Sequence, residues 1–102
     1  MEMDFKRVRE LLLEEVTGGD LGRELRLLLL VRDSWKGILG ERLYPHAKPY
    51  RIVRDTLLVA VDSSAWLQEL LFAREDIKRE VSKTTMGQVQ EVTFKVKHKP
   101  HL

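Results

Sequence analysis

The sequence contains no cysteine, and its 102 residues include only three prolines, six glycines and no apolar run longer than five residues. The absence of cysteine excludes disulfides, thiolate metal sites and cysteine nucleophiles. A membrane-spanning helix needs about 20 apolar residues, so no such helix is expected. The N-terminal ten residues, MEMDFKRVRE, lack the apolar stretch of a secretion signal. We therefore expect a cytoplasmic protein without a membrane partner.

The composition is that of a globular chain. Hydrophobic residues make up 43% of the sequence and charged residues 33%, which is unlike a disordered segment. A chain of this length buries roughly two-thirds of its unfolded surface, enough for one core. We expect one domain over residues 1–97, followed by a short basic tail at residues 98–102.

Two helices are predicted at the start of the chain. Asp4 can cap a helix that ends near Val16, and Asp20 can cap a longer one. Apolar residues recur in the second helix at spacings of three and four, which predicts a core-facing stripe. The residues of this stripe are Leu21, Leu25, Leu28, Val31, Trp35, Ile38 and Leu39.

The middle of the chain changes period. Residues 51–54 and 57–62 are rich in aliphatic side chains and predict an antiparallel hairpin. Its turn is predicted at Asp55 and Thr56. The polar cluster at residues 62–64 is a strong N-cap signal for the next element.

A third helix is expected from this cap to about Lys83, with Trp66 on its inward side. The last strand, residues 89–97, alternates so that Val92, Phe94 and Val96 face the helices. The predicted order is α-α-β-β-α-β. This is an α+β fold in which a three-stranded sheet has helices on one face and leaves the other face open.

Basic residues gather in residues 42–54 and in residues 88–102, where acids are few. Such clusters are typical of proteins that bind polyanions. The candidates for contact with nucleic-acid phosphates are Lys48, Arg51, Arg54, Lys95, Lys97 and Lys99. An alternative is that lysines on exposed strands only prevent aggregation.

Strand alternation places Lys95 and Lys97 on the open face of the sheet. Arg51 and Arg54 are three residues apart in a strand, so they cannot both lie there. Tyr50 is the obvious candidate for stacking on a base.

No catalytic, metal or cofactor site is predicted. Ser63 and Ser64 precede a helix, where capping accounts for them. His98 and His101 flank a proline and have no further ligands nearby, whereas zinc needs three or four convergent ligands. We expect neither a small-molecule substrate nor an enzymatic activity.

Two other features have competing interpretations. Leu30 and Phe72 lie opposite the apolar stripes of their helices, so they either form a partner-binding patch or are covered by the first helix. Gly37-Ile38-Leu39-Gly40 is literally a G-x-x-G, the sequence that clamps nucleic acid in KH domains. Because its middle residues are apolar, we favour close packing of the helix end as the role of these glycines.

Several of these residues together resemble the DciA family of bacterial proteins. Trp35 is followed by Gly40, by the loop exit at Pro49, and by the strand LLVAVD at residues 57–62. The run SSAWLQEL at residues 63–70 is the most specific part of the resemblance.

The resemblance implies a KH-like fold, binding to the DnaB-type replicative helicase, and assistance in loading it on single-stranded DNA. It also implies no ATPase activity, and the sequence has no G-x-x-x-x-G-K-[ST] motif. Our first hypothesis is a non-enzymatic adaptor that binds the helicase and DNA during replication. The alternatives are a KH-like RNA-binding module and an interaction domain without a nucleic-acid role.

Overall fold

The computed structural model describes residues 20–97. The predicted helix at residues 4–16, the tail at residues 98–102 and Lys99 lie outside these residues. The elements are α2 (Asp20–Leu43), the 3₁₀ turn η1 (Tyr44–His46), β1 (Ala47–Val53), β2 (Thr56–Val61), α3 (Ser64–Phe72), α4 (Arg74–Thr84) and β3 (Glu91–Val96).

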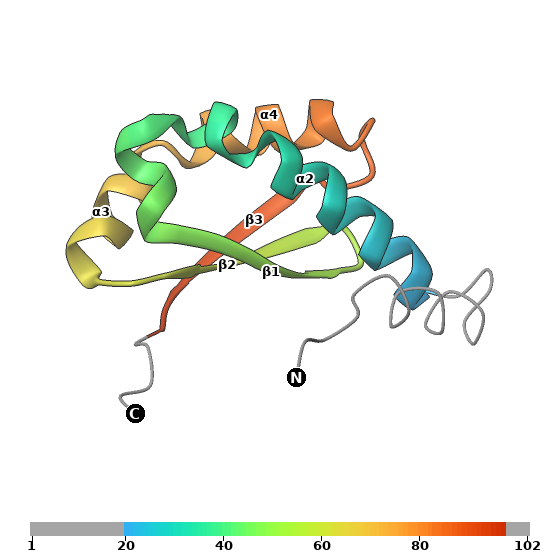
Figure 1. Cartoon of the computed structure of the whole chain (residues 1–102), viewed down its shortest axis with the longest axis horizontal. Helices are drawn as coiled ribbons and strands as arrows, with labels where there is room; N and C mark the ends of the chain where they lie inside the picture. The colour runs from blue at the N-terminus through green and yellow to red at the C-terminus, as the bar shows by residue number, and fades with distance from the viewer. Residues whose placement is uncertain (1–19, 98–102) are drawn as a thin grey trace, which may run out of the picture.

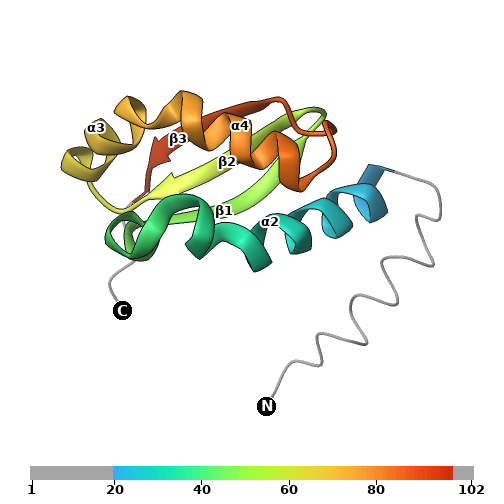
Figure 2. The same cartoon turned by 90° about the horizontal axis from the view of Figure 1, so that it is seen from above.

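The three strands form one mixed sheet in the order β1-β2-β3. β1 and β2 are antiparallel, whereas β2 and β3 are parallel and are joined by the two helices α3 and α4. Within residues 20–97, the helices lie on one side of the sheet and no element covers its other face (Figure 1). Seen from above, α2 runs along β1 while α4 lies nearer β3 (Figure 2). The predicted α+β class, with helices packed on a three-stranded sheet, is confirmed.

The core-facing side of α2 differs in part from the prediction. The buried residues recur every four positions and are Leu27, Val31, Trp35, Leu39 and Leu43, whereas Leu21 is 43% exposed. The face is rotated because α2 packs against both β1 and α4. Gly40 bends the helix with a φ of 83°, and no atom of the described residues lies within 4 Å of where its Cβ would be. Its role is therefore positive φ, and the predicted close packing at this position is wrong.

The predicted third helix is two helices. Ala73 leaves the helical conformation (φ −93°, ψ 6°), so α3 ends at Phe72 and α4 begins at Arg74. α3 packs on β2 and β3, whereas α4 packs on α2 and β3. These different supports give the two helices different axes, and no glycine or proline marks the break in the sequence.

The hairpin turn also lies one residue earlier than predicted. Val53 pairs with Thr56, so the turn is Arg54-Asp55, and Arg54 takes the positive φ of 56°. The Asp55 carbonyl accepts hydrogen bonds from the N–H of Gln90, just before β3, at 2.8 Å and from the N–H of Glu91, the first residue of β3, at 3.0 Å. This turn therefore fixes the register of β3 as well as that of the hairpin.

The alternation predicted for β3 is confirmed. Val92 and Phe94 are buried against the helices, Val96 is half-buried, and Lys95 is exposed. The opposite assignment would have placed a lysine in the core, where an unpaired charge is costly.

Thr85 provides a test of how the turn after α4 is held. It is fully buried, its hydroxyl donates to the Val81 carbonyl at 2.9 Å, and it accepts from the Val89 N–H at 3.1 Å. Thr85→Val keeps the shape but leaves that N–H unpaired, so we expect a loss of about 1–3 kcal/mol in the free energy of unfolding.

The matched control is Thr85→Ser, which keeps the hydroxyl and loses a methyl group. Amide hydrogen exchange separates the two causes, because the Val89 amide should exchange faster in the valine variant and stay protected in the serine variant. Equal protection in both variants would contradict the proposed role of the hydroxyl.

Candidate nucleic-acid interface

Three of the predicted basic residues meet on the uncovered face of the sheet. Lys48, Ala60 and Lys95 are neighbours in one cross-strand row, so two lysines flank a small residue. The Lys97 N–H continues the parallel ladder to the Val61 carbonyl at 2.8 Å. We call the surface formed by Lys48, Tyr50, Lys95 and Lys97 the basic sheet face.

Tyr50 joins the two basic segments. The register of β1 shifts between Pro49 and Arg51, so Tyr50 is the extra residue of a bulge. The Lys97 ammonium lies 4.0 Å from the centroid of the Tyr50 ring, a cation–π contact. The side chains of Tyr50 in β1 and of Lys97, just after β3, thus meet although β2 lies between the two strands.

Arg51 is bound to an acidic residue of α2. Its Nε and Nη2 donate to the Glu24 carboxylate at 3.0 and 3.4 Å, and that carboxylate also accepts the Ile52 N–H at 3.0 Å. The hydrogen bond that Arg51 donates to Glu24, together with the negative charge of that carboxylate, raises the pKa of Arg51. Arg51 is therefore occupied in attaching β1 to α2, and contact with phosphates remains a prediction for it.

Arg54 lies apart from the lysines. It occupies the hairpin turn, and its carbonyl accepts from Arg23 Nη1 at 3.1 Å. It lies six positions after Lys48 in the sequence, which corresponds to roughly 20 Å along an extended strand. The structure thus brings together Lys48, Lys95 and Lys97 and leaves Arg54 at the other end of the hairpin.

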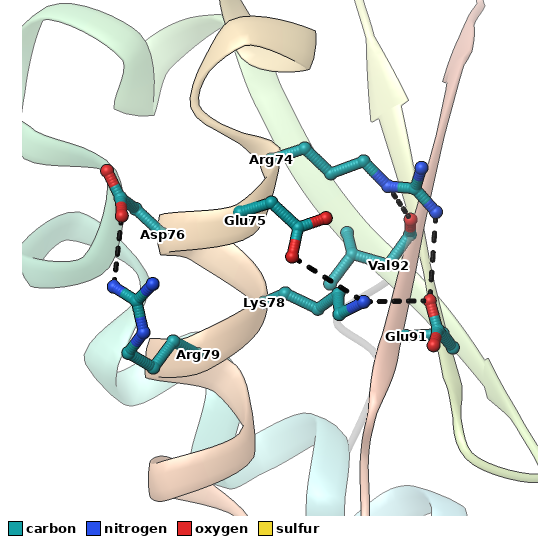
Figure 3. Close-up of polar contacts among 7 residues, drawn as sticks. All are labelled: Arg74, Glu75, Asp76, Lys78, Arg79, Glu91 and Val92. Atoms are coloured by element: carbon teal, nitrogen blue, oxygen red, sulfur yellow. Dashed lines mark hydrogen bonds and ion pairs between the residues drawn. The ribbon is translucent and has the colours of Figure 1, made fainter.

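The four cations of α4, which are Arg74, Lys78, Arg79 and Lys83, are paired with acids. Arg74 and Lys78 reach Glu91 at 3.7 and 3.5 Å, and Arg79 reaches Asp76 at 3.0 Å (Figure 3). In contrast, within residues 20–97 no carboxylate lies within 4.0 Å of the lysine ammonium groups of the basic sheet face. These lysines are therefore available to an external anion.

A groove between α2 and β1 adjoins this face. It encloses about 590 Å³, and its walls include Arg32 and Tyr44 as well as Lys48 and Tyr50. Arg32 and Tyr44 were not predicted as site residues. Arg32 is hidden by its distance from β1 in the sequence, whereas the Tyr44-Pro45 pair just before β1 and the Pro49-Tyr50 pair within it are a visible signal. We call this feature the α2–β1 groove.

The two predicted partner residues are exposed but separate. Leu30 is 41% exposed and lines a smaller groove with Leu29 and Met86. Phe72 is 87% exposed at the junction of α3 and α4, outside that groove. Whether the predicted first helix covers either residue lies outside the described part of the chain.

The two tryptophans have different environments. Trp35 is buried, and its Nε1 donates to the Ala47 carbonyl at 2.8 Å. Trp66 is half-buried at the edge of the core and stacks on His46, with ring centroids 3.9 Å apart. His46 Nδ1 lies 3.0 Å from Asp62. Trp66 therefore contributes less to the core than its place on the predicted inward stripe suggested.

Residues 20–97 contain no group of three or more metal-ligating side chains. In the same range, no helix has the length and apolar character needed to cross a bilayer. The G-x-x-G sequence lies within α2, and the junction between α3 and α4 carries Phe72 and Ala73 instead of glycines.

Together these features define a small α+β domain that combines a basic sheet face, an adjoining groove with tyrosines, and a separate exposed phenylalanine. The chain belongs to the DciA family, described as "Dna[CI] antecedent, DciA", whose family model matches residues 7–94. Membership supports a role associated with loading of the DnaB helicase in DNA replication, in a family that is generally non-catalytic. A comparison with curated proteins finds no match to this chain.

Proposed function

We propose that this chain is a non-enzymatic adaptor that binds the replicative DnaB-type helicase and DNA and assists loading of the helicase. The observation that carries the proposal is the family match over residues 7–94. The structure supports it by offering two surfaces on opposite sides of the sheet: the basic sheet face and the layer of helices (Figure 1). One chain has room to contact DNA and helicase at the same time.

The mechanism needs no chemistry in this chain. A protein that binds one conformation of a helicase ring more tightly than another raises the population of that conformation. If the preferred conformation admits single-stranded DNA, the adaptor promotes loading by its binding energy alone. The anionic strand is attracted to Lys48, Lys95 and Lys97, whose charges have no acidic partner among residues 20–97.

The direct test is to mix the purified chain with the replicative helicase of its own source and to measure co-elution in size-exclusion chromatography. The proposal predicts a complex. Separate elution at micromolar concentrations of both proteins would contradict it.

Phe72 is the proposed contact with the helicase. Because its side chain is 87% exposed, Phe72→Asp should leave the melting temperature close to the wild-type value. We expect it to abolish recovery of the helicase, since it places a charge in an apolar contact. The control is Gln68→Asp, which adds the same charge at another exposed position of α3. Equal recovery of the helicase by both variants would remove Phe72 from the interface.

A further inference from the structure

We propose that the α2–β1 groove is a stacking site for the bases of single-stranded nucleic acid, with Tyr44 and Tyr50 as the stacking platforms. Arg32 and Lys48 would hold the adjoining phosphates. The inference rests on the proposed DNA binding. It goes further by specifying that the groove recognises the unpaired bases of the DNA.

The groove has a rigid frame. Trp35 ties α2 to β1 through its hydrogen bond to the Ala47 carbonyl, and the Asp62 N–H ties η1 to β2 through the His46 carbonyl at 3.1 Å. Pro45 and Pro49 restrict the backbone next to each tyrosine. The rings are therefore carried by a fixed support, so that stacking on them needs little rearrangement.

The charges and rings of the groove match an anionic ligand with flat groups. None of its lining residues is acidic, and Arg32 and Lys48 have no carboxylate within 4.0 Å among residues 20–97. Each tyrosine also has a lysine near its ring: Lys36 lies 6.0 Å from the centroid of Tyr44, and Lys97 lies 4.0 Å from that of Tyr50. Aromatic rings interleaved with cations are the usual composition of sites for single strands.

An extended peptide fits this groove less well. A peptide that adds to a sheet edge needs free backbone groups along that edge. On β1 the Ala47 carbonyl is taken by Trp35, Pro49 has no N–H, and the Ile52 N–H is taken by Glu24. The outer edge of β1 therefore cannot pair with a further strand. A ligand in the groove would mainly contact side chains.

The groove is also continuous with the basic sheet face. Tyr50 and Lys48 line the groove and belong to that face as well. A strand that stacks at the groove can therefore continue across Lys97 and Lys95. A duplex keeps its bases paired and stacked internally, so it can use only the phosphate contacts.

The test compares Tyr44→Leu/Tyr50→Leu with Tyr44→Phe/Tyr50→Phe, which keeps both rings. Affinities for a thymidine oligomer and for a duplex of equal length are measured by fluorescence anisotropy. We expect the leucine variant to bind the oligomer at least about tenfold more weakly and the duplex with unchanged affinity. The phenylalanine variant should bind both like the wild type. Equal affinity of the wild type and the leucine variant for the oligomer would overturn the inference.

A second measurement needs no variant and so does not depend on folding. The wild-type chain should bind an abasic strand of the same length at least about tenfold more weakly than the thymidine oligomer. Equal binding of the two strands would overturn the groove as a base site while leaving DNA binding by the basic sheet face intact. A glutamate-rich peptide is the competitor that tests for a peptide site. If it displaces the oligomer, and if the leucine variant binds the peptide as much more weakly as it binds the oligomer, the groove is a peptide site and the inference is overturned. No binding of any oligomer would instead contradict the proposed DNA binding itself.

Discussion

Replacing Lys95 and Lys97 by glutamate is expected to weaken binding of single-stranded DNA about ten- to a hundredfold at low salt. Both lysines lie on the uncovered sheet face without an acidic partner in residues 20–97. The loss should be similar for all sequences, because phosphate contacts carry no sequence information. The melting temperature should change little, since both side chains are exposed.

Salt dependence measures how many phosphates are bound. About four contacts to a single strand give a log–log slope near −3, and losing two contacts should reduce its magnitude by about 1.4. Arg79→Glu/Lys83→Glu is the matched control, because it changes the net charge equally on α4, where both residues are already paired with acids. Full DNA binding by the Lys95/Lys97 variant, or an equal loss in the control, would remove the basic sheet face from the account. Competition with an RNA oligomer tests the RNA-binding alternative.

Trp35→Ala is expected to lower the free energy of unfolding by about 3–5 kcal/mol. Trp35 is 2% exposed, packs in the centre of the core, and supplies the hydrogen bond that joins α2 to β1. Trp35→Phe keeps most of the apolar volume and should cost about 1–3 kcal/mol, chiefly through the lost hydrogen bond and the cavity. Urea unfolding followed by circular dichroism measures both. A loss below about 1 kcal/mol for the alanine variant would show that Trp35 is not a core anchor.

The same measurement on Trp66→Ala separates the two tryptophans. Trp66 is half-buried and stacks on His46, so its replacement should destabilise the protein less than Trp35→Ala. Sequence periodicity alone places both residues on inward stripes and predicts similar losses. The difference arises because α3 lies at the end of the sheet, where one side of Trp66 meets the turn η1 instead of the core.

Features set by residues that are close in the sequence could be predicted, whereas features set by contacts between remote residues could not. The side-chain alternation of β3 depends on neighbouring residues, so the burial of Val92 and Phe94 could be predicted. The break at Ala73 could not, because it is set by packing of α3 and α4 on different partners. The turn at Arg54-Asp55 is stabilised by hydrogen bonds from residues 90 and 91, which are remote in the sequence.

The candidate nucleic-acid interface also combines predictable features with features that depend on remote contacts. Lys95 and Lys97 were predicted from alternation, whereas the engagement of Arg51 depends on Glu24, 27 residues earlier. The α2–β1 groove exists only once the helix is packed along the strand. Arg32 therefore carries no sequence signal that distinguishes it from other exposed helix residues.

The most direct test of the central claim is the amount of replicative helicase retained on closed circular single-stranded DNA, with and without this chain. The account predicts that the wild-type chain increases retention. It also predicts that the Phe72→Asp and Lys95→Glu/Lys97→Glu variants do so much less, because each loses one of the two contacts. Equal retention of the helicase with and without the wild-type chain would contradict the account.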